Sequence, residues 1–390
     1  MDKFFADYLL AIFILSVSLF DVSMATPISF ENIAIPIAGS DKAPVTPQFI
    51  FQAKDGYLIG GYSQSSQAAW AVKVDAHLAP VWQHVIPSKT WRGDVSIYPE
   101  YRSGARVGEA LYALCGVAPT TNKYIKTAFV SFVDDRGGIQ GVSEFESVVG
   151  GQKYSSGAAA CRELNGNLLI AGHKNVGFMK SKHWVALVSI RGDVIWEILI
   201  EPLKADPSLS FQGTSVSVAG GSIIVSSTDN QGTDIMCVTL EGRLKASKGF
   251  GGRYLLIQNP PGKIFQIIGA VASGPIGQLE LLSFDLELSP QGSRKIVNAA
   301  SFVSYSVKRL ADGALLFSGY VVRALSGSLS TAVAYMPSVL GKMEITRLSL
   351  LDGEIPGYAI AFSSGEDNLI GAQLINSPKS GVALHRILVN

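Results

Sequence analysis

One unit recurs seven times after residue 45, and no other feature of this sequence restricts the fold as strongly. Each copy begins with a turn rich in Gly, Asp or Asn, which leads into an aliphatic strand that often ends in Gly. A regular spacing of roughly 40 to 57 residues is typical of proteins built from repeated structural units. The seven copies of the turn and strand lie at 55–61, 109–114, 165–172, 220–225, 262–267, 312–319 and 367–371.

A second apolar strand follows each copy, and its position predicts the architecture. Together with a polar loop, another turn and a further strand, each repeat is expected to form a four-stranded antiparallel sheet. One such sheet cannot bury both faces, but sheets stacked radially can. We therefore predict an all-β fold, a seven-bladed β-propeller with few helices. The following strands lie at 70–75, 128–133, 184–190, 234–240, 279–285, 331–335 and 382–388.

The two ends of the repeat array indicate how the ring closes. The sequence stops just after the third strand of the seventh copy, so that blade lacks one strand. Residues 28–35 alternate between polar and apolar side chains ahead of the first copy and have no blade of their own. We predict that this N-terminal strand completes the seventh blade, which would remove an exposed edge. The alternative is a free N-terminal arm.

The first 25 residues resemble an export signal in composition. Lys3 precedes an apolar run at 8–20, and Ser23 and Ala25 place small residues at the −3 and −1 positions of a cleavage site. The run is shorter than the ~20 residues that span a bilayer, so cleavage is favoured over an uncleaved anchor. We predict a signal peptide at residues 1–25, a propeller at 26–390 and a periplasmic or secreted location.

Composition excludes some partners. Charged residues make up 16% of the chain, against roughly 25% in an average globular protein, and the net charge is +1. Nucleic-acid-binding proteins usually have a strongly basic balance, so we expect no nucleic-acid partner. A membrane partner is expected only if the N-terminal segment remains uncleaved, and the protein is expected to be a monomer.

Three cysteines lie inside apolar, strand-like segments: Cys115, Cys161 and Cys237. An oxidising compartment would allow one disulfide, and Cys115 and Cys161 could be neighbours in adjacent blades. The favoured interpretation is that all three are small buried core residues.

Two segments resemble repeats of the quinoprotein-like bacterial propellers. They are 71–82, with Asp75 and Trp82, and 188–196, with Trp196. The resemblance implies the propeller fold, and it implies that this motif packs one blade against the next. Neither segment has the Thr-Gly turn of that family, and the other blades lack the Trp. No adjacent cysteine pair or acidic metal-site cluster occurs in the sequence, so we expect no quinone and no other cofactor.

Loops between the second and third strands share a propeller face with the segments that cross between blades, and ligands usually approach this face. In this sequence those loops combine basic, aromatic and histidine side chains, which could hold an anionic or sugar-like ligand through charge-assisted bonds and stacking. The alternative is that they are ordinary solvated loop residues. The candidate ligand-binding residues are Lys89, Trp91, Arg92, Lys123, Tyr124, Lys126, Tyr154, His173, Lys180, His183 and Arg253.

No catalytic or metal-binding signature emerges from the sequence. His173 and His183 could form a metal pair or an acid–base couple, but no carboxylate partner is evident, and surface loop histidines are the favoured interpretation. Residues 229–234 loosely resemble a calcium loop but lack its spacing, so a polar turn is favoured. The sequence has no nucleophile elbow, P-loop or HExxH motif. We therefore predict no catalytic residues and no metal.

These observations favour an exported binding or scaffold propeller whose loop face holds a partner protein or an anionic or sugar-like ligand. The alternative is a propeller hydrolase or lyase that acts on a polysaccharide or lactone-like substrate. It requires two carboxylates, or a carboxylate and a histidine, to meet near the channel mouth. A quinone-dependent oxidoreductase is a third and less favoured possibility.

Overall fold

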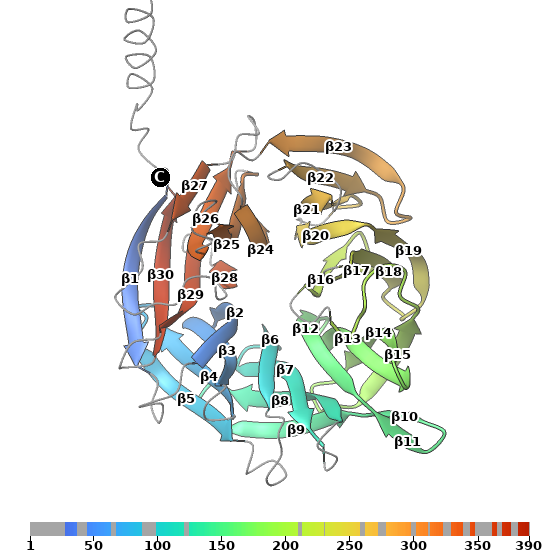
Figure 1. Cartoon of the computed structure of the whole chain (residues 1–390). Coiled ribbons are helices and arrows are strands. Elements are labelled where there is room, and N and C mark those ends of the chain that lie inside the picture. The colour runs from blue at the N-terminus through green and yellow to red at the C-terminus, as the bar shows by residue number, and fades with distance from the viewer. Residues whose placement is uncertain are drawn as a thin grey trace, which may run out of the picture.

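The computed structural model describes an all-β propeller of four-stranded antiparallel blades (Figure 1). It describes residues 28–36, 45–63, 68–87, 99–120, 125–209, 213–229, 231–257, 262–271, 278–297, 302–310, 313–322, 329–337, 344–347, 361–364, 369–375 and 381–389. These residues contain strands and turns but no helix. The predicted signal at residues 1–25 lies outside them.

Six blades are each built from four consecutive strands, with the first strand innermost. They are blade 1, β2 (Val45–Ala53), β3 (Gly56–Ser63), β4 (Ala68–Asp75) and β5 (Pro80–Pro87); blade 2, β6 (Glu100–Arg106), β7 (Leu111–Pro119), β8 (Lys126–Asp134) and β9 (Ile139–Phe145); blade 3, β12 (Ser156–Leu164), β13 (Asn167–Gly177), β14 (Lys180–Val188) and β15 (Val194–Ile200); blade 4, β16 (Ser215–Ala219), β17 (Ser222–Thr228), β18 (Thr233–Thr239) and β19 (Leu244–Phe250); blade 5, β20 (Gly252–Ile257), β21 (Phe265–Val271), β22 (Gln278–Phe284) and β23 (Pro290–Val297); and blade 6, β24 (Phe302–Arg309), β25 (Leu315–Val322), β26 (Leu329–Met336) and β27 (Glu344–Arg347).

A further sheet combines strands from both ends of the sequence. Its order is β1-β30-β29-β28, and Ile33 of β1 lies opposite Leu384 of β30 in an antiparallel register. A short hairpin, β10–β11, lies between blades 2 and 3. The bounds of these strands are β1 (Ile28–Pro36), β10 (Ser147–Val149), β11 (Gln152–Tyr154), β28 (Ala361–Ser364), β29 (Leu369–Ile375) and β30 (Gly381–Val389).

The repeat predicted from the sequence coincides with these strands. All seven copies of the turn and strand fall on the second strand of a sheet, and the strands predicted to follow them fall on the third. The turns between the third and fourth strands of several blades are closed by the side chain of one residue. Asp134 Oδ1, for example, accepts the amides of Arg136 and Gly138 at 2.8 Å each, and Asp75 and Asp285 act in the same way. Short polar side chains at these positions favour a tight turn over continued strand.

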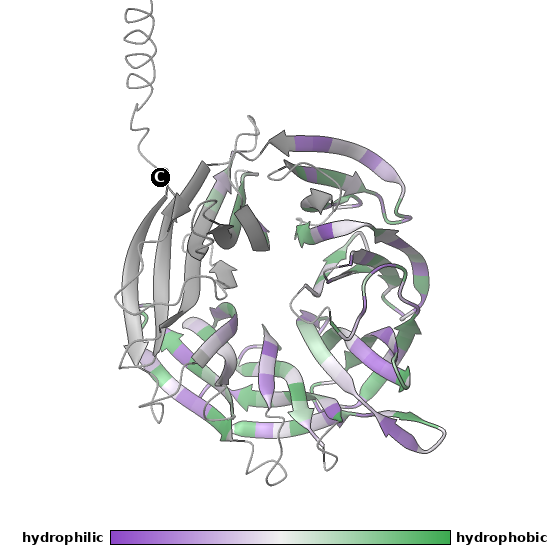
Figure 2. Ribbon diagram, in the orientation of Figure 1, coloured by the Kyte–Doolittle hydropathy of each residue, from purple (hydrophilic) through white to green (hydrophobic). Residues whose placement is uncertain are grey.

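The hydrophobic cores lie between blades, as radial stacking requires. Leu169 and Ala171 of blade 3, for instance, share one cluster with Val225 and Met236 of blade 4. Four further clusters join blades 1 and 2, 2 and 3, 4 and 5, and 5 and 6 in the described chain. Hydrophilic residues recur along the outer strands (Figure 2).

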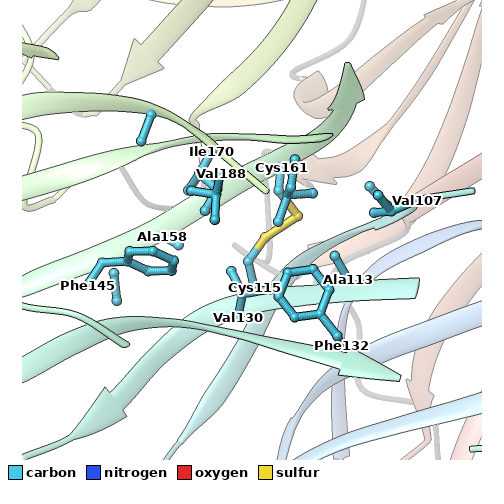
Figure 3. Packing of buried hydrophobic residues seen from close by; sticks show 14 of the residues in the cluster. Val107, Ala113, Cys115, Val130, Phe132, Phe145, Ala158, Cys161, Ile170 and Val188 are labelled. Atoms are coloured by element: carbon cyan, nitrogen blue, oxygen red, sulfur yellow. A yellow bond between two sulfur atoms is a disulfide. The ribbon is translucent and has the colours of Figure 1, made fainter. Parts of the chain in front are cut away.

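One of these cores contains a covalent link. Cys115 of β7 and Cys161 of β12 form a disulfide between blades 2 and 3 (Figure 3), with Phe132, Phe145 and Ile170 packed in the same cluster. The interpretation of all three cysteines as plain core residues is therefore wrong for this pair. It holds for Cys237, which is free and buried. The pair meets because both strands face the same interblade space.

The tryptophans of the family-like segments connect neighbouring blades. Trp82 Nε1 donates to the carbonyl of Asp135 at 3.1 Å, and Trp196 Nε1 donates to the carbonyl of Leu240 at 3.0 Å. A Cβ added to Gly242, whose φ is +82°, would lie 2.6 Å from the Trp196 ring. The turn therefore needs glycine both for its backbone conformation and for the approach of the ring. Asp75, by contrast, closes its own turn.

A β-bulge marks the same position in five blades. It interrupts the register between the third and fourth strands, just before the outer-strand residue that is Trp in blades 1 and 3. In blades 2, 4 and 5 the residue at that position is small. The five residues, in blade order, are Trp82, Gly141, Trp196, Ala246 and Gly292. The five blades thus share the bulge in their register, but only blades 1 and 3 place a Trp side chain there to contact the next blade.

Candidate functional site

Two kinds of segment share one face of the propeller. In an antiparallel blade the loop between the second and third strands lies at the same end as the segment that crosses to the next blade. We call this end the loop face; its described segments include 146–155, 178–179, 201–209 and 231–232. Contacts join them: the amide of Asn175 donates to the carbonyl of Ser155 at 2.8 Å, and the amide of Asp206 donates to Asp229 Oδ2 at 2.8 Å.

Asp234 is the centre of the loop face between blades 3 and 4. Its carboxylate accepts the backbone amides of Leu203, Lys204 and Ala205 at 2.8, 2.8 and 3.3 Å. A carboxylate holding several amides fixes the path of the crossing segment, because charge-assisted hydrogen bonds are short and strong. Asp234 and Asp229 therefore serve as acceptors for backbone amides, in agreement with the interpretation of 229–234 as a polar turn.

His183 is the fourth partner of Asp234. Its Nε2 lies 2.9 Å from Asp234 Oδ2, and the side chains of both residues are 2% exposed. The expectation that His183 is a surface histidine without a carboxylate partner is wrong. The two residues are 51 positions apart in sequence and meet only because blades 3 and 4 stack. Because Nε2 faces the carboxylate, it carries the proton, and Nδ1 of the ring has no partner in the described structure.

His173 lies opposite His183 on the neighbouring strand and is also buried. Burial lowers its pKa to about 3, and the positive charge of Arg102 contributes in the same direction. The ring is therefore neutral at physiological pH. The expectation of a surface loop residue is wrong for His173 as well, because β13 continues past it to Gly177 and the loop begins only after that residue.

Two basic side chains of blade 2, Arg102 and Lys126, lie near these histidines. Arg102, on the innermost strand β6, donates from Nε and Nη2 to Glu100 Oε2 at 3.2 and 3.1 Å. Burial lowers the pKa of Arg102 and also that of Lys126, which is half-buried at the start of β8. Both cations lie within the electrostatic reach of Glu100. Lys126 is partly desolvated and lies near an arginine that is already paired with Glu100, so an anion bound there would compensate the charge of Lys126.

The structure brings together some of the predicted site residues. Lys126, His173 and His183 lie on blades 2 and 3 at the loop face, with Lys180 at the start of β14 and Tyr154 in the β10–β11 hairpin on the same face. Arg253 lies near the loop-face end of β20, in blade 5. Five predicted residues fall outside the described chain: Lys89, Trp91, Arg92, Lys123 and Tyr124.

Tyr154 and Lys180 differ in their surroundings. The Tyr154 hydroxyl donates to Gln152 Oε1 at 3.0 Å within the β10–β11 hairpin, so it is engaged locally. Lys180 is exposed at the start of β14. Among the described residues, neither Tyr154 nor Lys180 forms a hydrogen bond with His173 or His183, so the predicted set does not form one compact site.

Arg102 was missed by the sequence analysis, and Glu100 and Asp206 were considered only as scattered carboxylates that could form a glycosidase pair. A usable signal existed for Arg102 and Glu100, since they are charged residues within a strand of a blade whose neighbouring positions are apolar or small. Asp234 was considered only as a calcium ligand. Among the residues that the structure describes, no three His, Cys, Asp or Glu side chains lie close enough to hold a metal ion.

The described part of the chain also contains no helix of the length and apolar character needed to cross a lipid bilayer.

Comparison with known proteins yields fold-level likeness only. The sequence matches no protein-family model and no curated protein. Among solved structures, an acylaminoacyl peptidase of Pyrococcus horikoshii is 14% identical with a TM-score of 0.48, over 89% of this chain and 52% of that chain. This chain thus spans about half the length of that peptidase.

Two smaller proteins are also similar in structure. The neuraminidase-like protein N11 of a flat-faced bat influenza virus is 11% identical with a TM-score of 0.43, over 83% of this chain and 95% of that chain. The WD40 domain of SCAP from fission yeast is 7% identical with a TM-score of 0.39, over 93% and 99%. At these similarities, no functional residue can be transferred to this chain.

Proposed function

We propose that the chain is an exported binding or scaffold propeller and that its loop face, at blades 2 to 4, binds an anionic ligand or an acidic or sugar-like surface of a partner. The observation that carries this proposal is the half-buried Lys126, whose pKa is lowered by burial, beside the ion pair of Arg102 and Glu100. Desolvated cations cost free energy unless an anion compensates them.

Hydrogen bonds hold the backbone around the proposed site in place. The crossing segment 201–205 is held by Asp234, and His183 fixes Asp234 from the neighbouring blade. A rigid surround is what a binding site needs, because ordering a loop on binding reduces affinity. His173, neutral and buried, would offer hydrogen bonds without adding charge.

Binding of an anion can be tested with one matched pair of variants. Lys126→Met removes the half-buried cation of the loop face, and Lys308→Met removes a similarly half-buried lysine, also of lowered pKa, near the opposite end of blade 6. Titration calorimetry with sulfated and carboxylated oligosaccharides should show affinity that Lys126→Met weakens about tenfold or more. Equal affinity of the two variants, or no binding to any anion, would contradict the proposal.

Export is supported by two observations of different kinds. The apolar segment and small residues at 1–25 have the composition of a signal peptide, and the disulfide between Cys115 and Cys161 is typical of proteins that fold in an oxidising compartment. N-terminal sequencing of the protein recovered from the periplasm or medium tests this. A start near Thr26 is the expected result, and retention of Met1 in the cytoplasm contradicts it.

The proposed ring has seven blades and is closed by the N-terminal strand. Support comes from the sheet that joins β1 to β30, and from contacts of β28 both with β2 of blade 1 and with β24 of blade 6. Cysteines introduced at Ile33 and Leu384, which lie opposite each other in the register, should cross-link in the intact protein. Absence of the cross-link, while the Cys115–Cys161 disulfide is intact, would contradict closure.

A hydrolase or lyase remains the second candidate, favoured by one observation. A histidine and a carboxylate meet at the loop face as such an enzyme requires, in the pair of His183 and Asp234. The pair is buried, and the carboxylate is engaged by three backbone amides, which leaves it poorly suited to act on a substrate. His183→Asn should therefore alter stability rather than any activity detected on polysaccharides or lactones.

A further inference from the structure

Exposed apolar side chains gather on one part of the loop face. Among the described residues, the large hydrophobic side chains that are exposed on this face all belong to segments that enter, cap or leave blade 3: Val148, Val149, Phe178, Met179, Leu203 and Leu209. We call this set the blade 3 patch. Other exposed apolar side chains lie on outer strands or on the opposite face, as Ile195 and Ile190 do. Such a concentration indicates a contact surface.

Phe178 and Met179 form the most prominent part of the blade 3 patch. They are the two residues between β13 and β14, and each is 88% exposed. Met179 has a φ of 55°, in the left-handed region that turns usually fill with Gly, Asn or Asp. Neither backbone preference nor burial within the chain accounts for a Phe-Met pair here. Residues that contradict local folding preferences are typically kept for function.

The segments that carry the patch are held in place. Ser147 Oγ at the base of the β10–β11 hairpin donates to the carbonyl of Asn175 on β13 at 2.6 Å, and Asn175 donates its amide to Ser155. Leu203 is fixed through its amide to Asp234. The hairpin extends outward beyond β9 and β15 (Figure 1). The patch is therefore a set of side chains that protrude from separate, anchored loops.

A lysine accompanies each apolar segment of the patch. Lys153 lies opposite Val148, Lys180 follows Met179, and Lys204 follows Leu203. Lys153 is paired with Glu146 at 2.7 Å. Within the described residues, no carboxylate lies within 4.0 Å of the ammonium groups of Lys180 or Lys204. Apolar tips beside unpaired lysines match the interface of an anionic bilayer, where the tips enter the acyl boundary and lysines stay at the phosphates.

We propose that the blade 3 patch binds peripherally to the surface of an anionic phospholipid bilayer. The patch protrudes from several loops instead of lining a groove, which suits a flat and deformable surface better than the pocketed surface of a protein partner. The inference rests on the loop face being the working surface of the protein, but it does not require the anionic ligand proposed for Lys126. Leu203 and Phe178 would reach the interfacial region while Lys180 and Lys204 contact headgroups.

The test is co-sedimentation of the exported protein with vesicles of phosphatidylcholine alone and with 30 mol% phosphatidylglycerol, where the wild type should bind the anionic vesicles more tightly. Phe178→Ser/Met179→Ser should lower the partition coefficient on both vesicles by about tenfold or more. Lys180→Glu/Lys204→Glu should lower it by about tenfold on anionic vesicles only. The matched control Val81→Ser/Ile195→Ser removes side chains that are 55% and 52% exposed on outer strands, and it should bind like the wild type.

Three results would overturn the proposal: a wild type that binds neither vesicle, a Phe178→Ser/Met179→Ser variant that binds as well as the wild type, or a wild-type dimer in sedimentation velocity that this variant dissolves. The last result would make the patch a contact between two copies of the chain. Lys126→Met should keep full vesicle binding, so that failure of the ligand site and failure of the bilayer contact are recorded separately.

Discussion

Cys115 on β7 and Cys161 on β12 are joined by a disulfide that crosses from blade 2 to blade 3. The two residues are 46 positions apart in sequence, and their strands face the same buried cluster. A covalent bond between blades that are otherwise joined by packing and hydrogen bonds restricts the unfolded chain and couples the unfolding of the two blades.

Loss of this disulfide should destabilise the protein measurably. We expect Cys115→Ala/Cys161→Ala to lower the free energy of unfolding by about 2–4 kcal/mol. Urea denaturation with and without dithiothreitol measures the effect. The reductant should shift the midpoint of the wild type and of Cys237→Ala, whose thiol is free, but not that of the double variant. A wild-type midpoint that is insensitive to reductant would show that the bond does not form.

Trp196 should contribute strongly to the interface of blades 3 and 4. Its ring packs on the Gly242 turn, and its Nε1 donates to Leu240. Trp196→Ala should cost about 2–3 kcal/mol, and Trp196→Phe about 1 kcal/mol, because the ring is largely kept and the hydrogen bond is lost. The control Val194→Ala changes an exposed residue on the same strand and should stay within ~0.5 kcal/mol. Equal costs for the Phe and Ala variants would contradict the packing role.

His173 should make stability depend on pH. Its pKa is about 3 in the folded protein and 6.5 in the unfolded chain, so between these values the unfolded state binds more protons. The stabilisation is complete above the unfolded pKa and is lost as pH falls from 6.5 toward 3, with a slope of at most about 1.4 kcal/mol per pH unit. His173→Gln should flatten the stability profile from pH 4 to 6 in chemical denaturation. An unchanged slope would contradict the burial of the neutral ring.

The ion pair of Lys73 and Asp135 gives a double-variant test. Lys73 is buried, lies 2.5 Å from Asp135 on the next blade, and shares that carboxylate with Tyr112. Asp135→Ala leaves a buried ammonium without its nearest partner and should cost about 2–4 kcal/mol. Lys73→Met/Asp135→Ala should recover part of that loss. If the double variant is less stable than Asp135→Ala alone, the buried charge is not the cause of the cost.

The same pair predicts acid sensitivity. Hydrogen bonds from Lys73 and Tyr112 lower the pKa of Asp135. A carboxyl group with a lowered pKa contributes stability above its unfolded pKa of about 3.9, and this stability is lost as pH falls through the folded value. Wild type and Asp135→Asn should therefore converge in stability at acid pH, once the pH lies below the lowered pKa of Asp135. A stability difference that persists at that pH would contradict the ionised pair.

The blade pattern could be predicted because each of its turn and strand signals depends only on residues that are close in sequence. A Gly, Asp or Asn turn followed by an aliphatic run indicates a tight turn and a strand wherever it occurs, and the structure confirms this at Asn165–Gly166 and β13. Asp75 and Asp134 close the turns between the third and fourth strands with their own side chains. The antiparallel four-stranded blade follows from the number of these signals in each repeat. This inference does not depend on how neighbouring blades pack against each other.

The site was harder to predict because it depends on how blades stack. His183 and Asp234 meet across two blades, and the alternation of β14 does not specify which residue of β18 lies opposite. The same geometry decides that Cys115 and Cys161 bond while Cys237 stays free. His173 was misjudged because strand β13 is longer than the apolar run, so a residue assigned to a loop is buried within the sheet.

The varied residue beside each β-bulge also bears on how the chain avoids errors while folding. Proteins with several similar units risk pairing a unit with the wrong neighbour or with the same unit of another molecule. Trp196 fits a glycine turn such as that of Gly242, whereas Gly141 and Ala246 offer no ring to such a turn. Blades 1 and 3 thus carry a ring that packs on the glycine turn of the following blade, and placing a blade with Gly or Ala at that position before such a turn would leave the turn without its ring.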